Sequence, residues 1–515
     1  MDNYFVSSCK RVKDWICRQF GQKEKKTVHH KKFADGGEVI VWETGRAGEE
    51  AASYENLFLR KEIAGFRTNI RREQSCSIKS LTRDYLYKQL LSSGEYTFDH
   101  MLVIKDPYGE APLTALALFI LEEPACVRVT TKGNLKETDF VTELPKKKEH
   151  RVPILGMYAE KANDIVIEIL DDEGNCVKSH TFTIRTKRLP KSLRNVITVK
   201  KWTDKPAYSN IMINGGVKIH TCVFDIEGKI RYYLSRKPRG YGIFPLSDGH
   251  FFYMEKYISV PSYSNPQTVE SYDMDYFGRV FRTYLTEKGV HHTAEEKAGG
   301  NILTGSNSML EHTEDCVIEI DRQTGEIVWQ LNMAEIFDET YQNMMDWCHV
   351  NSAAYYEKDR TILISLRNVH AVICVDYDTK KLRWILSDPK FWEGTKMTPY
   401  LLQPEGDVKW CYQQHAAFEI ALPDESNPQK KRIIVYDNHW AKRRKAKSFD
   451  KDPLSYVSFY DIDEEKKSVS LHKRFAGPKT RIRANGIYVP DKKRVYNMAG
   501  SYACLLYTSP SPRDS

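Results

Sequence analysis

Histidine, arginine and asparagine side chains recur in four short polar segments that lie beside apolar, β-forming runs. The four segments are His291-His292, Asp346 to Ser352, Ser365 to Asn368, and Gln413 to Ala416. Imidazole is a nucleophile and a proton carrier near pH 7, and the guanidinium of arginine binds anionic oxygens with a planar pair of N–H groups. A site that joined these segments would suit the transfer of an anionic group.

Each histidine taken singly is more readily explained as an ordinary buried side chain that satisfies its own hydrogen bonds. The group becomes informative because the segments fall at corresponding places of a repeating pattern. The elements that must position these side chains therefore decide whether they meet.

A weak internal repeat begins at about residue 203. Its unit is a β-forming run that ends in Asp, then a turn, then a second run that often ends in Trp. The repeated residues are Asp225, Asp275, Asp321, Asp376 and Asp461, at spacings of 50, 46, 55 and 85. A period near 50 predicts propeller blades, and the last spacing predicts an inserted loop. The inner strands of blades converge on a central channel, where side chains far apart in sequence would meet. An unrelated series of hairpins is the plainer alternative.

The segment before this repeat has a different β-rich texture. Short β-forming runs separated by turn signals predict a small β-sandwich over residues 98–187. The expected strands are Met101–Ile104, Thr114–Leu121, Cys126–Thr130, Arg151–Leu155, Asp164–Ile169 and His180–Ile184. Residues 1–97 form an N-terminal extension whose regular part is a helix near Ile78–Leu91. The expected fold is all-β: a six-bladed β-propeller over residues 203–505, preceded by the sandwich and the partly helical extension.

The tail is expected to be foreign to the protein. Residues 506–515, Leu-Tyr-Thr-Ser-Pro-Ser-Pro-Arg-Asp-Ser, break the β texture and resemble translated adapter sequence. We therefore expect the last blade to be truncated and these residues to be disordered or poorly packed.

Composition and charge limit the partners. The 515 residues carry a net charge of +8, and their two basic runs, Lys146–Lys148 and Lys442–Lys447, come with no nucleic-acid recognition motif. No apolar run is long enough to cross a bilayer. We expect neither nucleic-acid binding nor a transmembrane span. The 11 cysteines include no CxxC pair, and no secretory signal is visible, so we expect reduced thiols and a cytoplasmic location.

The polar segments together resemble the bacterial arylsulfotransferase family. The match is most specific from Asp346 to Trp384, where Asp-Trp-x-His-x-Asn-Ser is followed by Ser-x-Arg, an apolar run, Asp and a final Trp. Gln414-His415-Ala416, Tyr436-Asp437-Asn438 and the paired His291-His292 fit as well. The resemblance covers residues 98 to 504 and implies a six-bladed propeller with a sulfohistidine intermediate and no nucleotide cofactor (PAPS).

The resemblance also implies roles for particular residues. His415 corresponds to the nucleophile, and His349 and Arg367 to groups that hold the sulfuryl oxygens, with Asn351 in support. His292 corresponds to the group that acts on the phenol oxygen, although His291 could take its place. The expected activity is that of an aryl-sulfate sulfotransferase, with phenolic sulfate esters as donors and phenols as acceptors. The oligomeric state stays open.

The sequence also departs from the family. Its well-known members are exported, whereas no export signal is visible here, and Ala416-Ala417 stands where an acidic residue is expected. Pro190-Lys191-Ser192 faintly resembles a phosphosulfate-binding loop but lacks the glycine that lets backbone approach a phosphate. We read it as a linker.

Two other functions stay open at this point. His291, His292, Glu295 and His349 could bind a metal in a propeller hydrolase or lyase, although adjacent residues of a strand point to opposite sides and no metal is expected. A non-catalytic interaction module is the other alternative, but it would need neither an arginine nor histidines in a channel.

Overall fold

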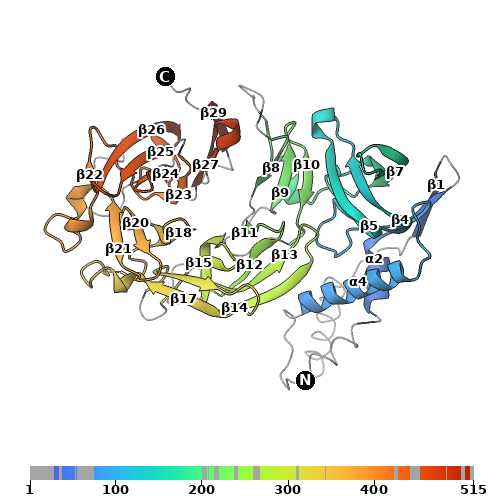
Figure 1. Cartoon of the computed structure of the whole chain (residues 1–515), viewed down its shortest axis with the longest axis horizontal. Coiled ribbons are helices and arrows are strands. Elements are labelled where there is room, and N and C mark those ends of the chain that lie inside the picture. Colours follow the sequence, from blue (N-terminus) through green and yellow to red (C-terminus); the bar gives the residue numbers. More distant parts are fainter. Residues whose placement is uncertain are drawn as a thin grey trace, which may run out of the picture. The chain divides into compact units, whose positions relative to one another are not determined.

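The computed structural model of the chain is mostly β-strand (Figure 1). It describes residues 28–33, 37–52, 54, 75–199, 206, 208–213, 220–236, 242–258, 267–308, 312–342, 344–422, 427–440, 453–482, 484–499 and 505–510. The chain divides into two compact units. The first holds residues 1–197, 222–236 and 276–281, and the second holds residues 198–221, 237–275 and 282–515.

One seven-stranded sheet forms the centre of the first unit. Its order is β1-β2-β3-β4-β6-β7, with β5 also paired to β4. All of these pairs are antiparallel except β2 with β3. The strands are β1 (Val28–Lys32), β2 (Glu38–Trp42), β3 (His100–Lys105), β4 (Ala115–Thr131), β5 (Phe140–Ile154), β6 (Ala162–Leu170) and β7 (Cys176–Arg185).

The long strand β4 folds this sheet over on itself. Its first part pairs with β3 and its second part with β6, while β5 follows it along both parts. The register with β5 shifts between Ile120 and Val127, around the exposed residues 122–124. Strands that change partners at such an irregularity connect the two layers of a sandwich. β4 is therefore one strand where the sequence predicts two, and it supplies the expected sandwich-like core.

Two helices pack against this sheet. They are α2 (Thr44–Ala52) and α4 (Ser75–Ser92), and α4 confirms the helix predicted near Ile78–Leu91. Their buried side chains share one apolar cluster with Leu102 and Leu116 of the sheet. No helix in the described part of the chain is long and apolar enough to cross a membrane.

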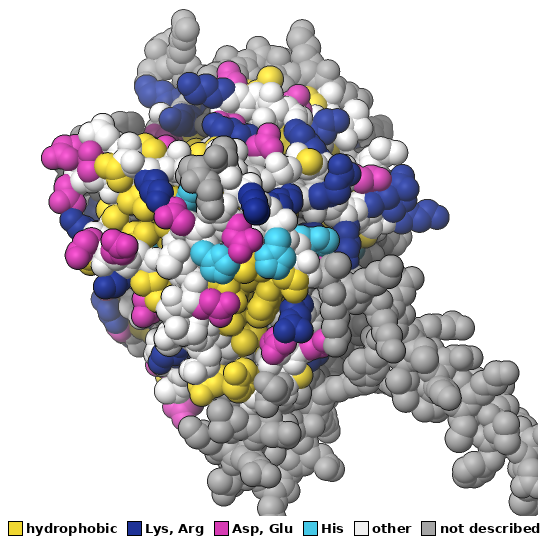
Figure 2. Space-filling model, turned by 90° about the vertical axis from the view of Figure 1, so that its right-hand side faces the viewer, with side chains coloured by type: hydrophobic (Ala, Val, Ile, Leu, Met, Phe, Trp, Pro, Cys, Tyr) yellow, Lys and Arg dark blue, Asp and Glu magenta, His cyan; other side chains and the backbone are white. Residues whose placement is uncertain are grey.

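Charges of both signs are interspersed with histidines on the face of the molecule in Figure 2. In the first unit, His29 pairs with Glu43, and His30 and His100 both pair with Glu38.

The repeat region consists of successive sheets. Strands β11 to β14 and β14 to β17 make two meanders that share the long strand β14; β18 to β21, β23 to β26 and β27 to β29 make three more, and the short strand β22 pairs in parallel with β26. With the short strands β8 to β10, of which β9 and β10 belong to the first unit, these are six successive groups, as the sequence predicts for six blades. The strands are β8 (Asn210–Ile213), β9 (Cys222–Asp225), β10 (Ile230–Tyr233), β11 (Gly242–Pro245), β12 (Phe251–Ile258), β13 (Gln267–Met274), β14 (Val280–Glu296), β15 (Ile302–Ser306), β16 (Cys316–Ile320), β17 (Ile327–Asn332), β18 (Val350–Tyr356), β19 (Thr361–Leu366), β20 (Ala371–Asp376), β21 (Leu382–Leu386), β22 (Gln403–Pro404), β23 (His415–Ile420), β24 (Lys430–Asp437), β25 (Leu454–Asp463), β26 (Ser468–Pro478), β27 (Ala484–Val489), β28 (Arg494–Ala499) and β29 (Leu505–Pro510).

The repeated Asp marks the next-to-last strand of the first five groups. It ends β9 and β20, directly follows β13 and β16, and lies within β25. At three of these places its carboxylate accepts hydrogen bonds from the backbone of the following turn: Asp225 from Glu227 and Lys229, Asp321 from Gln323 and Thr324, and Asp376 from Thr379. Asp favours turns because its side chain can replace a backbone acceptor. The repeat is therefore a turn signal, and the all-β propeller expectation is confirmed.

The tail differs in part from its expected state. Leu505–Pro510 form β29, which pairs antiparallel with β28. The expectation of disorder is therefore wrong for residues 506–510. Residues 511–515 lie outside the described part of the chain, and the foreign origin of the tail stays a prediction.

Candidate active site

Three strands of successive sheets carry a β-bulge where they reach the predicted site. The register shifts between His291 and Ala294 in β14, between Val350 and Ser352 in β18, and between His415 and Ala417 in β23. A bulge turns side chains out of the regular alternation and is common next to active sites. These bulges place residues from three blades in one region.

Several residues of this region have a left-handed backbone. His292 has φ 59°, Glu314 56°, His349 56°, Gln413 47° and Ala416 45°. Such conformations cost a non-glycine residue of order 1–3 kcal/mol and gather at functional sites. The surrounding hydrogen bonds hold the backbone in these conformations, so the side chains are fixed in advance.

His415 begins β23 and is 7% exposed. Its Nδ1 lies 2.7 Å from Oδ1 of Asn438, whose Nδ2 donates to the carbonyl of Thr480 at 3.1 Å. The second bond fixes which end of the amide faces the ring, because only the amide nitrogen can donate to a carbonyl. His415 therefore donates from Nδ1, and its Nε2 carries the lone pair.

The electrostatic surroundings keep this imidazole neutral. Burial first, and then the positive charge of Arg367, lower the pKa of His415 to about 3. The amide of Asn438 and the backbone of Gln413 act in the opposite direction but are weaker. A neutral imidazole is the nucleophilic form, so His415 is in the reactive state throughout the neutral range.

Arg367 and Asn351 are tied to the same region by hydrogen bonds. Arg367 follows β19, its backbone N–H donates to the carbonyl of His349 at 3.1 Å, and its guanidinium donates to the side chain of Gln413 at 3.2 Å. Asn351 donates from Nδ2 to the carbonyl of Gln414 at 2.8 Å, which places it next to His415. The structure thus brings Arg367, Asn351, His349 and His415 together.

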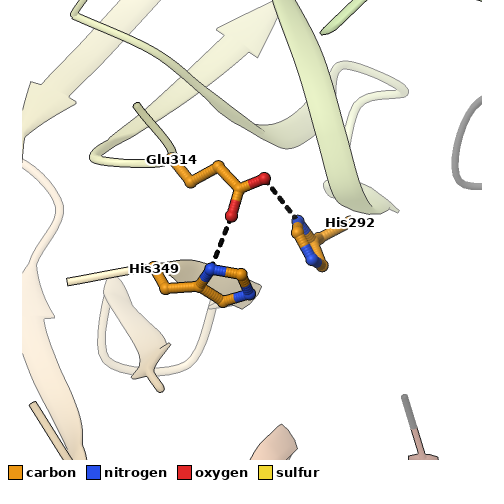
Figure 3. Close-up of side chains that lie close together, drawn as sticks. All are labelled: His292, Glu314 and His349. Atoms are coloured by element: carbon orange, nitrogen blue, oxygen red, sulfur yellow. Dashed lines mark ion pairs between the residues drawn. The ribbon is translucent and has the colours of Figure 1, made fainter. Parts of the chain in front are cut away.

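His292, Glu314 and His349 form a second cluster beside them (Figure 3). Nδ1 of His349 lies 2.6 Å from Oε2 of Glu314, and Nδ1 of His292 lies 3.8 Å from its Oε1. Nδ1 of His349 also lies 2.9 Å from a carboxylate oxygen of Asp346. The two imidazole rings are 4.8 Å apart. The carboxylate of Glu314 therefore lies beside a ring nitrogen of both histidines.

The two histidines of this cluster differ in protonation. Burial lowers the pKa of His292 well below its ordinary value, and the neighbouring carboxylate of Glu314 offsets this only in part. Burial also acts to lower the pKa of His349, but Glu314 and Asp346 outweigh it and raise that pKa to about 9. Near neutral pH the cluster therefore contains one neutral imidazole and one imidazolium.

His291 is the more deeply buried of the two neighbouring histidines and contacts the cluster through His292. Its side chain is fully buried, its Nε2 contacts the carbonyl of Ser306 at 2.8 Å, and its Nδ1 lies 3.1 Å from Nδ1 of His292. The side chain of His292 keeps 15% exposure. Of the two neighbours, His292 is the more open to a substrate and His291 supports it.

The candidate metal ligands in the structure differ from those expected from the sequence. Ligand atoms of His292, Glu314 and His349 lie within 4.8 Å of one another, which could accommodate an ion, and neither His291 nor Glu295 belongs to this set. Both carboxylates, however, face the same nitrogen of His349, which is the arrangement of an imidazolium ion pair. A doubly protonated imidazole has no lone pair for a metal. The geometry therefore favours the ion pair.

Sequence reasoning missed the roles of three residues. Asp346 and Asn438 lie within the quoted motifs but were given no part, and Glu314 was not singled out. Glu314 lies in the loop between β15 and β16, in His312-Thr-Glu-Asp315, and nothing local separates it from a solvated loop residue. Only the fold brings it to His349.

The fold and the site suit an enzyme that transfers an anionic group. A family model described as arylsulfotransferase (ASST) matches residues 195–505, and one described as arylsulfotransferase Ig-like domain matches residues 102–187. The chain belongs to the arylsulfotransferase family.

Individual relatives are distant. The arylsulfate sulfotransferase AssT of Lelliottia amnigena is 21% identical over 71% of this chain and 78% of its own length. AssT of Escherichia coli O6:H1 is 22% identical over the same shares. Among solved structures, an auxiliary nutrient binding protein of Bacteroides thetaiotaomicron is 12% identical and covers 77% of this chain and 94% of its own, but its TM-score of 0.36 is too low to support an argument.

Proposed function

We propose that the protein moves a sulfuryl group from a phenolic sulfate ester to a phenol through a sulfohistidine on His415. The observation that carries this proposal is the pair His415–Asn438, which leaves a neutral imidazole with its lone pair on Nε2. Arg367 lies close enough to His415 to lower its pKa, so an anionic sulfuryl group at His415 would also meet the guanidinium.

The reaction has two displacements. Nε2 of His415 attacks sulfur, the bond from sulfur to the aryl oxygen breaks, and its electron pair leaves with the first phenol. Arg367 and His349 hold the sulfuryl oxygens, with Asn351 in support, and the pair of His292 and His349 supplies the proton to the departing oxygen. The second phenol then returns that proton and attacks sulfur, and the electron pair of the N–S bond goes back to Nε2. No nucleotide takes part.

The adduct can be tested directly. We expect enzyme mixed with nitrophenyl sulfate alone, then quenched and digested, to give a peptide containing His415 that is heavier by one sulfuryl group. Initial-rate lines should be parallel, because the first phenol leaves before the second binds. His415→Ala should show neither adduct nor transfer. Intersecting lines, or strict dependence on a nucleotide sulfate, would contradict the proposal.

A metal-dependent hydrolase is the second candidate, and the closeness of His292, Glu314 and His349 is what favours it. Elemental analysis of the purified protein separates the two. A stoichiometric metal, with activity lost on chelation and restored by the ion, would support this candidate. Transfer that persists in chelator, with the adduct on His415, would remove it.

A further inference from the structure

Glu314 is held in place by the strands that carry the site. It is fully buried, its backbone N–H donates to the side chain of Asn307 at 2.8 Å, and its carbonyl accepts the backbone N–H of Val350 at 2.7 Å. Val350 follows His349 directly. The carboxylate is therefore fixed relative to the histidine it faces, and its backbone is held in the left-handed region at φ 56°.

The surroundings of His349 would otherwise favour a neutral ring. Its charged and titratable neighbours are Glu314 and Asp346, which contact Nδ1, and the nearby His292, His291 and His415. The three neighbouring histidines all have a lowered pKa, with burial as the first cause. His349 is also buried, but two carboxylates lie within 3 Å of its Nδ1, whereas His292 faces Glu314 at 3.8 Å. Glu314 makes the shorter contact, at 2.6 Å against 2.9 Å.

We propose that Glu314 is a positioning residue whose buried carboxylate, close to Nδ1, holds His349 as an imidazolium, with Nδ1–H hydrogen-bonded to Asp346 and Nε2–H left to donate to an anionic oxygen of the substrate. Figure 3 shows the second ring nitrogen of His349 on the side away from Glu314. The inference rests on the proposed function for the identity of that oxygen, but the protonation of His349 does not depend on it.

The consequence for catalysis is a charge that is in place before the substrate arrives. Preorganised donors aimed at developing negative charge lower a barrier without reorganisation. The Nε2–H group of an imidazolium is such a donor, and it also provides a proton for the departing phenol oxygen. A neutral ring with its only proton on Nδ1 would supply neither.

The test compares Glu314→Gln with Glu319→Gln. Glutamine keeps the shape and removes the charge. Glu319 is a buried carboxylate of β16 that pairs with Lys297 and lies outside the site, so its variant controls for the loss of a buried charge. The readout is the pKa of His349 by NMR of nitrogen-labelled histidine, assigned with a His349→Gln sample. A lost carboxylate contact changes a pKa by about 1–3 units.

We expect the pKa of His349 to fall from about 9 by about two units in Glu314→Gln and to stay in place in Glu319→Gln. At pH 8 the ring would then be only about one-tenth protonated, so transfer should drop about tenfold and return toward the wild-type rate near pH 6. In Glu314→Asp, which keeps the charge, the pKa of His349 should fall by less than it does in Glu314→Gln. A purely structural role would instead lower the rate equally at every pH.

The pKa of His349 in these variants decides whether the inference stands. An unchanged pKa of His349 in a folded Glu314→Gln protein overturns the inference. Should Glu314→Gln fail to fold, an unshifted pKa of His349 in Glu314→Asp, where the shorter side chain draws back from Nδ1, overturns it as well. A pKa of His349 that falls in Glu314→Gln, together with a wild-type protein that shows no sulfuryl transfer, would keep the inference and remove the proposed function.

Discussion

In the proposed reaction, Arg367 acts through the shape of its side chain as well as through its charge. A lysine at 367 would keep the charge but lose the planar pair of N–H groups that fits two sulfuryl oxygens. We therefore expect Arg367→Lys to lose about 2–4 kcal/mol of transition-state stabilisation, the cost typical of removing one such donor. Steady-state kinetics with a nitrophenyl sulfate donor checks this, and full activity in the lysine variant would make Arg367 structural.

The buried neutral histidines should make the protein sensitive to acid. The pKa of His415 is about 3 in the fold and about 6.5 when unfolded, so below pH 6.5 only the unfolded chain gains the proton. The free energy of unfolding then falls by about 1.4 kcal/mol per pH unit for this residue, down to about pH 3. His291 and His292 act in the same direction. His349 acts oppositely: its stabilisation is complete below pH 6.5 and is lost as the pH rises through about 9.

Urea unfolding at pH 7.0 and 5.5 tests this balance. We expect His415→Ala to lose less stability on acidification than the wild type. His472→Ala, at a 38% exposed side chain, should behave like the wild type. Equal losses in wild type and His415→Ala would show that His415 is protonated in the fold.

At the scale of elements, the sequence predicted strands better than their irregularities. The repeated Asp located the next-to-last strands because its turn-forming role is local. The bulges at His291–Ala294, Val350–Ser352 and His415–Ala417 were not predicted, because a bulge depends on which residue lies opposite. For the same reason the histidine motifs were visible in the sequence, whereas Glu314, which is set by loop packing, was not.

Gly305 of β15 leaves room for the ring of His291. It pairs with His291, and a Cβ here would lie 2.6 Å from Cε1 and 2.8 Å from Nδ1 of that ring. Gly305→Ala should therefore displace His291 and, through their 3.1 Å contact, His292. We expect a loss of about 1–3 kcal/mol in stability, as for other overpacked cores, with a clear drop in kcat. Thermal unfolding and kinetics measure both.

The matched control is Gly48→Ala in α2. There a Cβ meets only the end of the Arg83 side chain, at 3.2 Å. Alanine is favoured over glycine in a helix by about 1 kcal/mol, so this variant should be as stable as the wild type or more so. A Gly305→Ala enzyme with wild-type kcat would show that His291 does not set the position of His292.

At the scale of the whole molecule, a buried arginine holds part of the repeat region within the first unit. Arg231 of β10 is fully buried and donates to the carbonyls of Gly156 and Thr138 at 2.6 and 2.7 Å, and it lies 3.5 Å from the buried Asp225. Its guanidinium also covers the ring of Tyr158, 4.1 Å from the centroid. The hairpin of β9 and β10 is thereby fixed to the folded sheet.

Arg231→Met should destabilise the protein by about 3–5 kcal/mol, because it leaves the carboxylate of Asp225 buried without its cation. Adding Asp225→Asn should recover part of this loss. Arg128→Met, which breaks a partly exposed pair with Glu143, should cost no more than about 1 kcal/mol. Urea unfolding measures all three, and a small effect of Arg231→Met would mean that solvent reaches Asp225.

The two compact units are interleaved along the chain. The chain passes between them after residues 197, 221, 236, 275 and 281. Domains joined by one linker can be exchanged between genes by a single recombination event. Here a crossover near residue 200 would separate the folded sheet from the hairpin that Arg231 fixes to it. We therefore expect the two units to be encoded by one gene.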